Sequence, residues 1–119
     1  MSPGVFGWHR DTLTRLRAPE TTDTYGNPTR DWSAAGRLEM PGWRVQPMQG
    51  SRATAAETIP REGLARMRRC FGPPGADVLT TDRVEWQGET WRIEGDVDLW
   101  RSPTGRLDHT ELIISRMEG

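Results

Sequence analysis

The sequence predicts a mainly β protein, folded as a small twisted β-barrel of about six or seven short strands. Apolar and polar residues alternate over short runs, which is the period of a strand with one buried face. The 119 residues include 13 Gly and 9 Pro, and a density this high favours short strands and many turns over long helices. A barrel is preferred to an open sheet because closure removes exposed strand edges.

The clearest predicted element is a β-hairpin within residues 82–100. Apolar residues alternate on both sides of Gln87-Gly88, and glycine supplies the positive φ that a two-residue turn needs. Such a turn pairs Val84 with Trp91, so that pattern and register agree. The apolar residues that then share one face are Val84, Trp86, Trp91 and Ile93.

Shorter alternating runs predict the remaining strands. Trp32 is expected to be the buried residue of one of them, and Pro47 closes another, since proline is confined to strand ends and edges. Residues 64–71 also fit a helical spacing, but glycine and proline on both sides leave room only for a short strand. These predicted strands are residues 11–17, 29–33, 42–47, 64–71 and 110–117.

The chain is long enough for one domain with a single core. Residues 1–10 are predicted to form an extended N-terminal arm, and residues 11–119 a single β-barrel domain. Phe6 and Trp8 in the arm indicate either docking on a neighbouring chain or a frayed terminus with two incidental aromatic residues, and both interpretations stay open. Residues 48–63 carry no apolar pattern and predict a long loop between strands, which is generally either functional or disordered.

Charge and composition argue against several classes of function. The net charge is −1, whereas non-specific nucleic-acid binding usually needs a clear basic excess. Every basic residue is Arg, which we attribute to a GC-rich genome. The chain has neither a run of membrane-spanning length nor a signal-peptide pattern, so we expect synthesis in the cytoplasm and no membrane partner. The single cysteine, Cys70, excludes a disulfide framework and is expected to be a buried structural thiol.

No motif in the sequence indicates catalysis, a cofactor or a metal. His9 and His109 are isolated and lack metal-ligand spacing with another His or Cys. Nucleophile-elbow, phosphate-loop and dinucleotide-binding motifs are absent from the sequence. We therefore expect a non-enzyme without catalytic, cofactor-binding or metal-binding residues. Arg66 and Arg68 lie in the densest basic cluster, and nearby acidic residues favour solvated or inter-subunit ion pairs over phosphate binding.

A series of landmarks runs through residues 42–119: Gly42-Trp-Arg-Val-Gln-Pro47, Pro73-Pro-Gly-Ala-Asp77, Asp82-Arg-Val84, the hairpin with Gly88, Ile93-Glu-Gly95, Trp100-Arg-Ser-Pro103 and Arg116-Met-Glu-Gly119. Their order and spacing resemble the head-to-tail stopper proteins of long-tailed bacteriophages, or siphoviruses, particularly those that infect actinobacteria. These proteins are also called head-closure or head–tail connector proteins. The first 40 residues are consistent with the family but unspecific.

The resemblance implies a structural virion protein. In the family, small β-barrel subunits form a ring on the axis that DNA follows from head to tail, and extended loops converge on the channel to retain packaged double-stranded DNA. Here the corresponding loop is residues 48–63, whose small side chains suit crowding at an axis. The residues implied for channel gating are Gln49, Gly50, Ser51, Arg52, Ala53, Thr54, Ala55, Ala56 and Glu57.

The resemblance also implies the partners. A portal or adaptor ring lies on the head side, and a tail terminator or tail tube lies on the tail side. The ring is expected to be closed and cyclic, with six copies preferred to twelve by analogy. The candidates for contacts between subunits or rings are Trp8, Trp100, Arg66 and Arg68.

Two other functions stay open. One is another connector ring protein of the same particle, either an adaptor or a tail terminator. The other is a monomeric small-barrel module that binds single-stranded nucleic acid through stacked tryptophans, which requires exposed Trp beside a basic groove.

Overall fold

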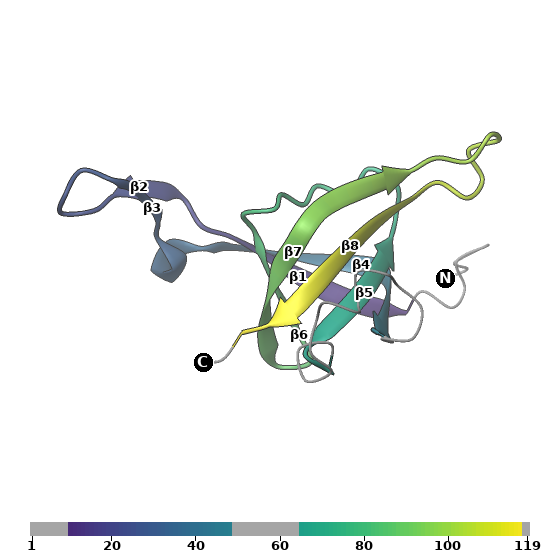
Figure 1. The fold of residues 1–119 in the computed structure, drawn as a ribbon, viewed down its shortest axis with the longest axis horizontal. Helices are drawn as coiled ribbons and strands as arrows, with labels where there is room; N and C mark the ends of the chain where they lie inside the picture. Colours follow the sequence, from purple (N-terminus) through teal and green to yellow (C-terminus); the bar gives the residue numbers. More distant parts are fainter. Residues whose placement is uncertain (1–9, 49–64, 118–119) are drawn as a thin grey trace.

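The computed structural model describes residues 10–48 and 65–117 and shows a closed antiparallel β-barrel (Figure 1). The barrel strands follow the order β1-β4-β5-β8-β7-β6, and β6 pairs with β1 to close it. A separate ribbon of β2 and β3 lies outside the barrel. The predicted fold class is confirmed. The strands are β1 (Asp11–Arg17), β2 (Glu20–Thr22), β3 (Pro28–Arg30), β4 (Gly36–Pro47), β5 (Met67–Gly72), β6 (Arg83–Trp86), β7 (Glu89–Trp100) and β8 (His109–Arg116).

The β6–β7 hairpin forms in the predicted register. Gln87 and Gly88 have φ angles of 51° and 75°, the left-handed geometry of a tight two-residue turn. Val84 pairs with Trp91, and the indole N–H of Trp91 donates to the carbonyl of Trp86 at 3.2 Å. The four predicted apolar residues all contribute to the core, with Trp86 only partly buried.

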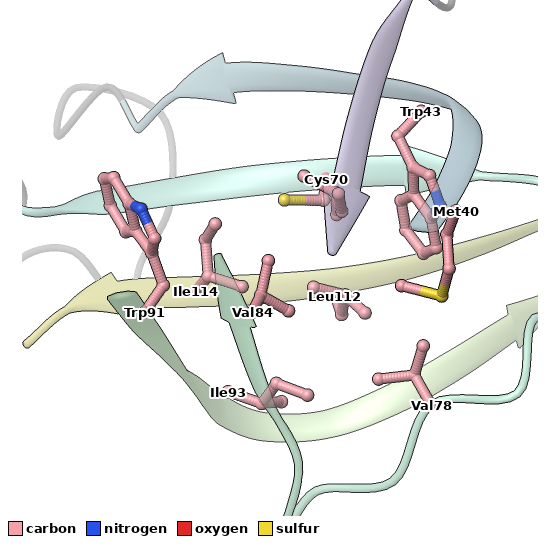
Figure 2. Packing of buried hydrophobic residues seen from close by; sticks show 10 residues of the cluster. Met40, Trp43, Cys70, Val78, Val84, Trp91, Ile93, Leu112 and Ile114 are labelled. Atoms are coloured by element: carbon pink, nitrogen blue, oxygen red, sulfur yellow. The ribbon is translucent and has the colours of Figure 1, made fainter. Parts of the chain in front are cut away.

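Inward-facing side chains from all the barrel strands fill the barrel, as Figure 2 shows. Trp43 and Trp91 are the largest fully buried side chains. Because side chains occupy its interior, the described barrel is a packed core and not a pore. The buried cluster consists of Leu13, Met40, Trp43, Cys70, Val78, Val84, Trp91, Ile93, Leu112 and Ile114.

Gly72 in β5 makes room for the indole of Trp43. A Cβ atom built on Gly72 would lie 2.5–2.6 Å from three atoms of the Trp43 ring, closer than any side chain tolerates. Glycine at this position therefore lets the ring pack against the β5 backbone.

Residues 73–82, which we call the crossover, connect β5 to β6 and place Val78 in the core. Thr110 holds the start of the crossover, because its hydroxyl donates to the carbonyl of Pro73 at 2.7 Å and accepts from the backbone N–H of Ala76 at 3.3 Å. Thr110 itself is buried.

The segment around Trp32 differs from the prediction. β3 ends at Arg30, and Trp32–Ala34 forms a 3₁₀ turn whose N-cap, Asp31, accepts from the backbone N–H of Ser33. Trp32 is not fully buried, because the ribbon stands outside the barrel and offers it no core. Its ring instead packs under the guanidinium of Arg83, 3.9 Å from the ring centroid.

Two other predicted strands differ only in their bounds. β4 begins at Gly36 instead of Gly42, because its first half pairs with β1 before its second half pairs with β5. The run at residues 64–71 is a strand and not a helix, observed as Met67–Gly72, and Leu64 lies outside the described residues. In residues 10–48 and 65–117, no helix has the length and apolarity needed to cross a membrane.

Gly72→Ala is expected to destabilise the barrel by about 1–3 kcal/mol, because the added methyl group forces Trp43 out of its packed position. Urea denaturation followed by tryptophan fluorescence measures the change. Gly36→Ala is the matched control, since a Cβ atom there meets only the Arg17 carbonyl oxygen at 3.9 Å. Equal stability of the two variants would contradict the proposed packing role of Gly72.

Candidate interaction surfaces

Two arginines of β1 bind the crossover through an arginine–aspartate cluster, formed by Arg15, Arg17, Asp77 and Asp82. The Nε and Nη2 atoms of Arg17 donate to the two carboxylate oxygens of Asp82 at 2.9 Å and 2.8 Å. The side chain of Asp82 is 1% exposed and also accepts from the backbone N–H of Leu79 at 2.8 Å. These hydrogen bonds satisfy the buried carboxylate. Because they come from both β1 and the crossover, they fix the position of the crossover relative to β1.

Asp77 occupies the exposed side of the same cluster. Arg15 Nη1 lies 3.1 Å from one of its carboxylate oxygens, and Arg17 Nη2 lies 3.2 Å from the other. The hydrogen bond from Arg17, followed by its charge, lowers the pKa of Asp77. The hydrogen bonds to Asp82 and Asp77 raise the pKa of Arg17 in turn. The cluster therefore ties the crossover to β1 from both its buried and its exposed sides.

The ribbon tip, which we define as residues 20–31, projects away from the barrel (Figure 1). Asp23 Oδ1 accepts the backbone N–H groups of Tyr25 and Asn27, both at 2.9 Å, and so fixes the turn between β2 and β3. Tyr25 is 88% exposed at the end of this ordered turn. The ribbon tip thus presents an aromatic side chain that the described barrel does not use.

The arm tip, which we define as residues 99–109, projects from the opposite end of the longest axis (Figure 1). Two hydrogen bonds fix its loop. The carboxylate of Asp108 accepts from the backbone N–H of Ser102 at 2.7 Å, and the hydroxyl of Ser102 accepts from the backbone N–H of Leu107 at 3.1 Å. Leu99, Trp100 and Leu107 are 48%, 52% and 62% exposed. Three of the large apolar side chains that are exposed among the described residues therefore lie on the arm tip.

The structure separates the contact residues that the sequence analysis proposed. Trp100 lies at the arm tip, its ring stacked on that of His109 with centroids 6.2 Å apart. Arg66 lies beside the other end of β8, where its carbonyl accepts from the backbone N–H of Arg116 at 2.9 Å. Arg68 packs over the ring of Trp91, 5.5 Å from its centroid, at the mouth of the barrel. Trp8 and Gln49–Glu57 lie outside the described residues.

Sequence reasoning did not find Tyr25 and Leu107. The sequence Tyr25-Gly-Asn-Pro28 indicates a turn, and a side chain inside a turn is commonly exposed to solvent. The arginine–aspartate cluster gave no local signal, because 65 residues separate Arg17 from Asp82.

One free thiol, that of Cys70, lies among the described residues. Burial raises the pKa of the Cys70 thiol to about 12. Cys70 is fully buried, as predicted. Within residues 10–48 and 65–117, no three His, Cys, Asp or Glu side chains are grouped to hold a metal ion.

Comparison with known proteins bears on the fold. The solution structure of protein SF1141 from Shigella flexneri 2a aligns over 90% of this chain and 91% of its own, with a TM-score of 0.60 and 16% sequence identity. The structure of xkdH, a protein of the phage-like element PBSX of Bacillus subtilis, aligns over 91% and 92%, with a TM-score of 0.39 and 14% identity. The first likeness shows a shared fold alone, and the second is too distant to support an argument. Neither a family model nor a curated protein matches the chain.

Arg17→Met is expected to lower the free energy of unfolding by about 3 kcal/mol, because it leaves the Asp82 carboxylate buried without its cation. Chemical denaturation at neutral pH measures the loss. Arg37→Met is the matched control, since it breaks an ion pair with Glu85 whose partners are both exposed and is expected to change stability little. A loss in Arg17→Met no larger than that of the control would show that the cluster does not anchor the crossover.

Asp77→Asn is expected to lower the unfolding temperature at pH 7, and the difference from wild type is expected to shrink on acidification. The pKa of Asp77 is lowered in the folded protein from an ordinary value of 3.8. Its stabilisation is therefore present above that pH and is lost as the pH falls through the folded-state pKa. Thermal unfolding followed from pH 7 to about pH 2 tests this.

Asp96→Asn serves as the control for this series, since it removes the same charge from the exposed part of β7, away from the cluster. A difference between Asp77→Asn and wild type that stays constant over the pH range would contradict the linkage.

Proposed function

We propose that the protein is a subunit of a ring at the head–tail interface of a long-tailed bacteriophage. In this role it acts as a head-closure, or stopper, protein that helps to retain packaged DNA and provides the docking surface for the tail. The proposal of this particular assembly rests on the sequence landmarks in residues 42–119, because they resemble the head-to-tail stopper family. The small closed β-barrel is the fold that the resemblance implies.

The observation that carries the proposal is the placement of exposed apolar residues. Tyr25 and Leu107 lie on two tips that project at opposite ends of a closed, packed barrel. A subunit of a cyclic ring needs two different surfaces, one for each neighbour. The packed core also means that a DNA channel has to run between subunits and not through the described barrel.

The connection between β4 and β5 is proposed to supply the gate. Pro47 pairs with Arg68, so the connection leaves the barrel where Arg68 packs over Trp91. The Gln87-Gly88 turn lies at this same end of the barrel. Arg116 donates its backbone N–H to the carbonyl of Arg66, just before β5, and Met117 donates to the carbonyl of Thr90, just after the turn, both at 2.9 Å. Gln49–Glu57, the proposed gating residues, lie outside the described residues, and the connection that holds them starts from β4, which belongs to neither tip. A ring could therefore place its subunit contacts and its gate on separate surfaces.

The described tryptophans do not favour binding of single-stranded nucleic acid. Trp43 and Trp91 are buried in the core, and Arg83 covers Trp32. Trp100 is exposed beside Arg101, but it is the only exposed tryptophan among the described residues, whereas a nucleic-acid groove needs several stacked aromatic residues beside positive charge. An adaptor or a tail terminator remains the alternative within the same particle.

Deletion of residues 50–60 in the phage that carries the gene is expected to yield particles that package DNA and then lose it. The physical reason is that the channel would lack the side chains proposed to close it. Electron microscopy of purified particles, with counts of DNA-filled and tailed heads, measures the effect. Normal DNA retention in the deletion mutant would exclude the gating role.

Two measurements on purified protein accompany the deletion. Mass photometry of the wild type and the deletion variant, alone and with the portal protein of the same phage, shows whether both still form the ring. A protein that stays monomeric, ignores the portal and retards short oligonucleotides in a gel would instead favour the nucleic-acid-binding module.

A further inference from the structure

The ribbon tip has a net negative charge and the arm tip a net positive one, although the ribbon tip also contains Arg30 and the arm tip also contains Asp108. Among the described residues, the acidic side chains of the ribbon tip form no salt bridge with a cation, and neither do Arg101 and Arg106 of the arm tip. Arg101 and Arg106 are both exposed. The acidic residues of the ribbon tip are Glu20, Asp23 and Asp31.

Both tips also present apolar side chains in an ordered setting. Hydrogen bonds from the turn to Asp23 fix the backbone around Tyr25, and hydrogen bonds to Ser102 and Asp108 fix the backbone around Leu107. Surfaces that are already ordered lose less conformational entropy when they bind. Tyrosine and tryptophan are also enriched in the buried centres of protein interfaces.

We propose that the ribbon tip of one copy docks on the arm tip of the next copy in the ring. Tyr25 packs against Leu107 and Trp100 of its neighbour, while the acidic residues of the ribbon tip face Arg101 and Arg106. The inference deepens the proposed function, since it names the contact that builds the ring. The two tips lie at opposite ends of the longest axis, so repetition of this contact passes from copy to copy in one direction (Figure 1). This is the geometry of a heterologous, head-to-tail interface.

A mixing experiment tests the direction of the contact. Tyr25→Ser disables the ribbon tip, and Leu107→Ser disables the arm tip, so each variant alone is expected to be monomeric where wild type forms rings. An equimolar mixture retains one intact pair of tips, namely the ribbon tip of Leu107→Ser and the arm tip of Tyr25→Ser. Sedimentation velocity is therefore expected to show dimers of one chain of each variant and no larger species.

Leu38→Ser is the matched control for the mixing experiment. Leu38 is 46% exposed but lies on β4 in the barrel wall, away from both tips. This variant is expected to form rings as wild type does. Rings formed by Leu107→Ser as readily as by Leu38→Ser would overturn the proposed contact.

Charge reversal tests the electrostatic part. Glu20→Arg and Arg101→Glu are each expected to weaken self-association about tenfold at low salt, and less at high salt because ions screen the interaction. Glu20 has no side-chain hydrogen bond among the described residues, so its replacement leaves the turn intact, unlike that of Asp23. A chain carrying both reversals restores opposite charges at every contact and is expected to recover assembly. Failure of the double variant to recover would contradict the pairing of these surfaces.

The outcomes separate this contact from the proposed function. If wild-type rings form and the tip variants assemble equally well, the tip contact is wrong and the ring subunit stands. If the mixing experiment gives the expected dimers but rings ignore the portal, the contact stands and the head–tail role fails. Wild-type protein that remains monomeric up to high concentration overturns the tip contact itself.

Discussion

Closure of the barrel depends on one ion pair beside a short seam. β1 and β6 pair over only three residues on each strand, from Thr14 to Leu16 and from Arg83 to Glu85. Arg17 continues β1 beyond that seam and binds the buried carboxylate of Asp82, the residue directly before β6. The pair thus holds the two strands in register where the hydrogen-bonded ladder ends. Since a buried charge without its partner is strongly destabilising, the crossover and the closing strand are fixed together.

Among the described residues, the two tips contribute no side chain to the buried core of the barrel. The core is complete without Tyr25 or Leu107, and the local hydrogen bonds of each tip shape it without help from the barrel. A composition with 34% hydrophobic residues fits this arrangement, because a small core and polar projections need few apolar side chains. Tyr25 and Leu107 are exposed in the isolated subunit, and contact with a neighbouring copy would remove their apolar surface from water. The proposed assembly follows from this.

The sequence predicted what local patterns determine. The hairpin around Gln87-Gly88 was confirmed in class and register, since its turn chemistry and its alternation act over a few residues. Trp32 was misplaced, because alternation does not reveal that a ribbon lies outside the barrel, where no core is within reach. The contact between Arg17 and Asp82 was out of reach for the same reason, as it exists only once distant strands meet. Of the proposed contact residues, Trp100 lies on a projecting tip, whereas Trp8 and the gating residues lie outside the described residues.

The buried thiol of Cys70 has a practical consequence for studying the assembly. It is the only cysteine of the chain, and burial raises its pKa to about 12, so the reactive thiolate is scarce at neutral pH. The folded protein is therefore nearly silent towards maleimide and other thiol reagents. A cysteine introduced at any exposed position would be the sole attachment point for a fluorophore or spin label. Distances between copies in a working particle could then be followed without replacing a native core residue.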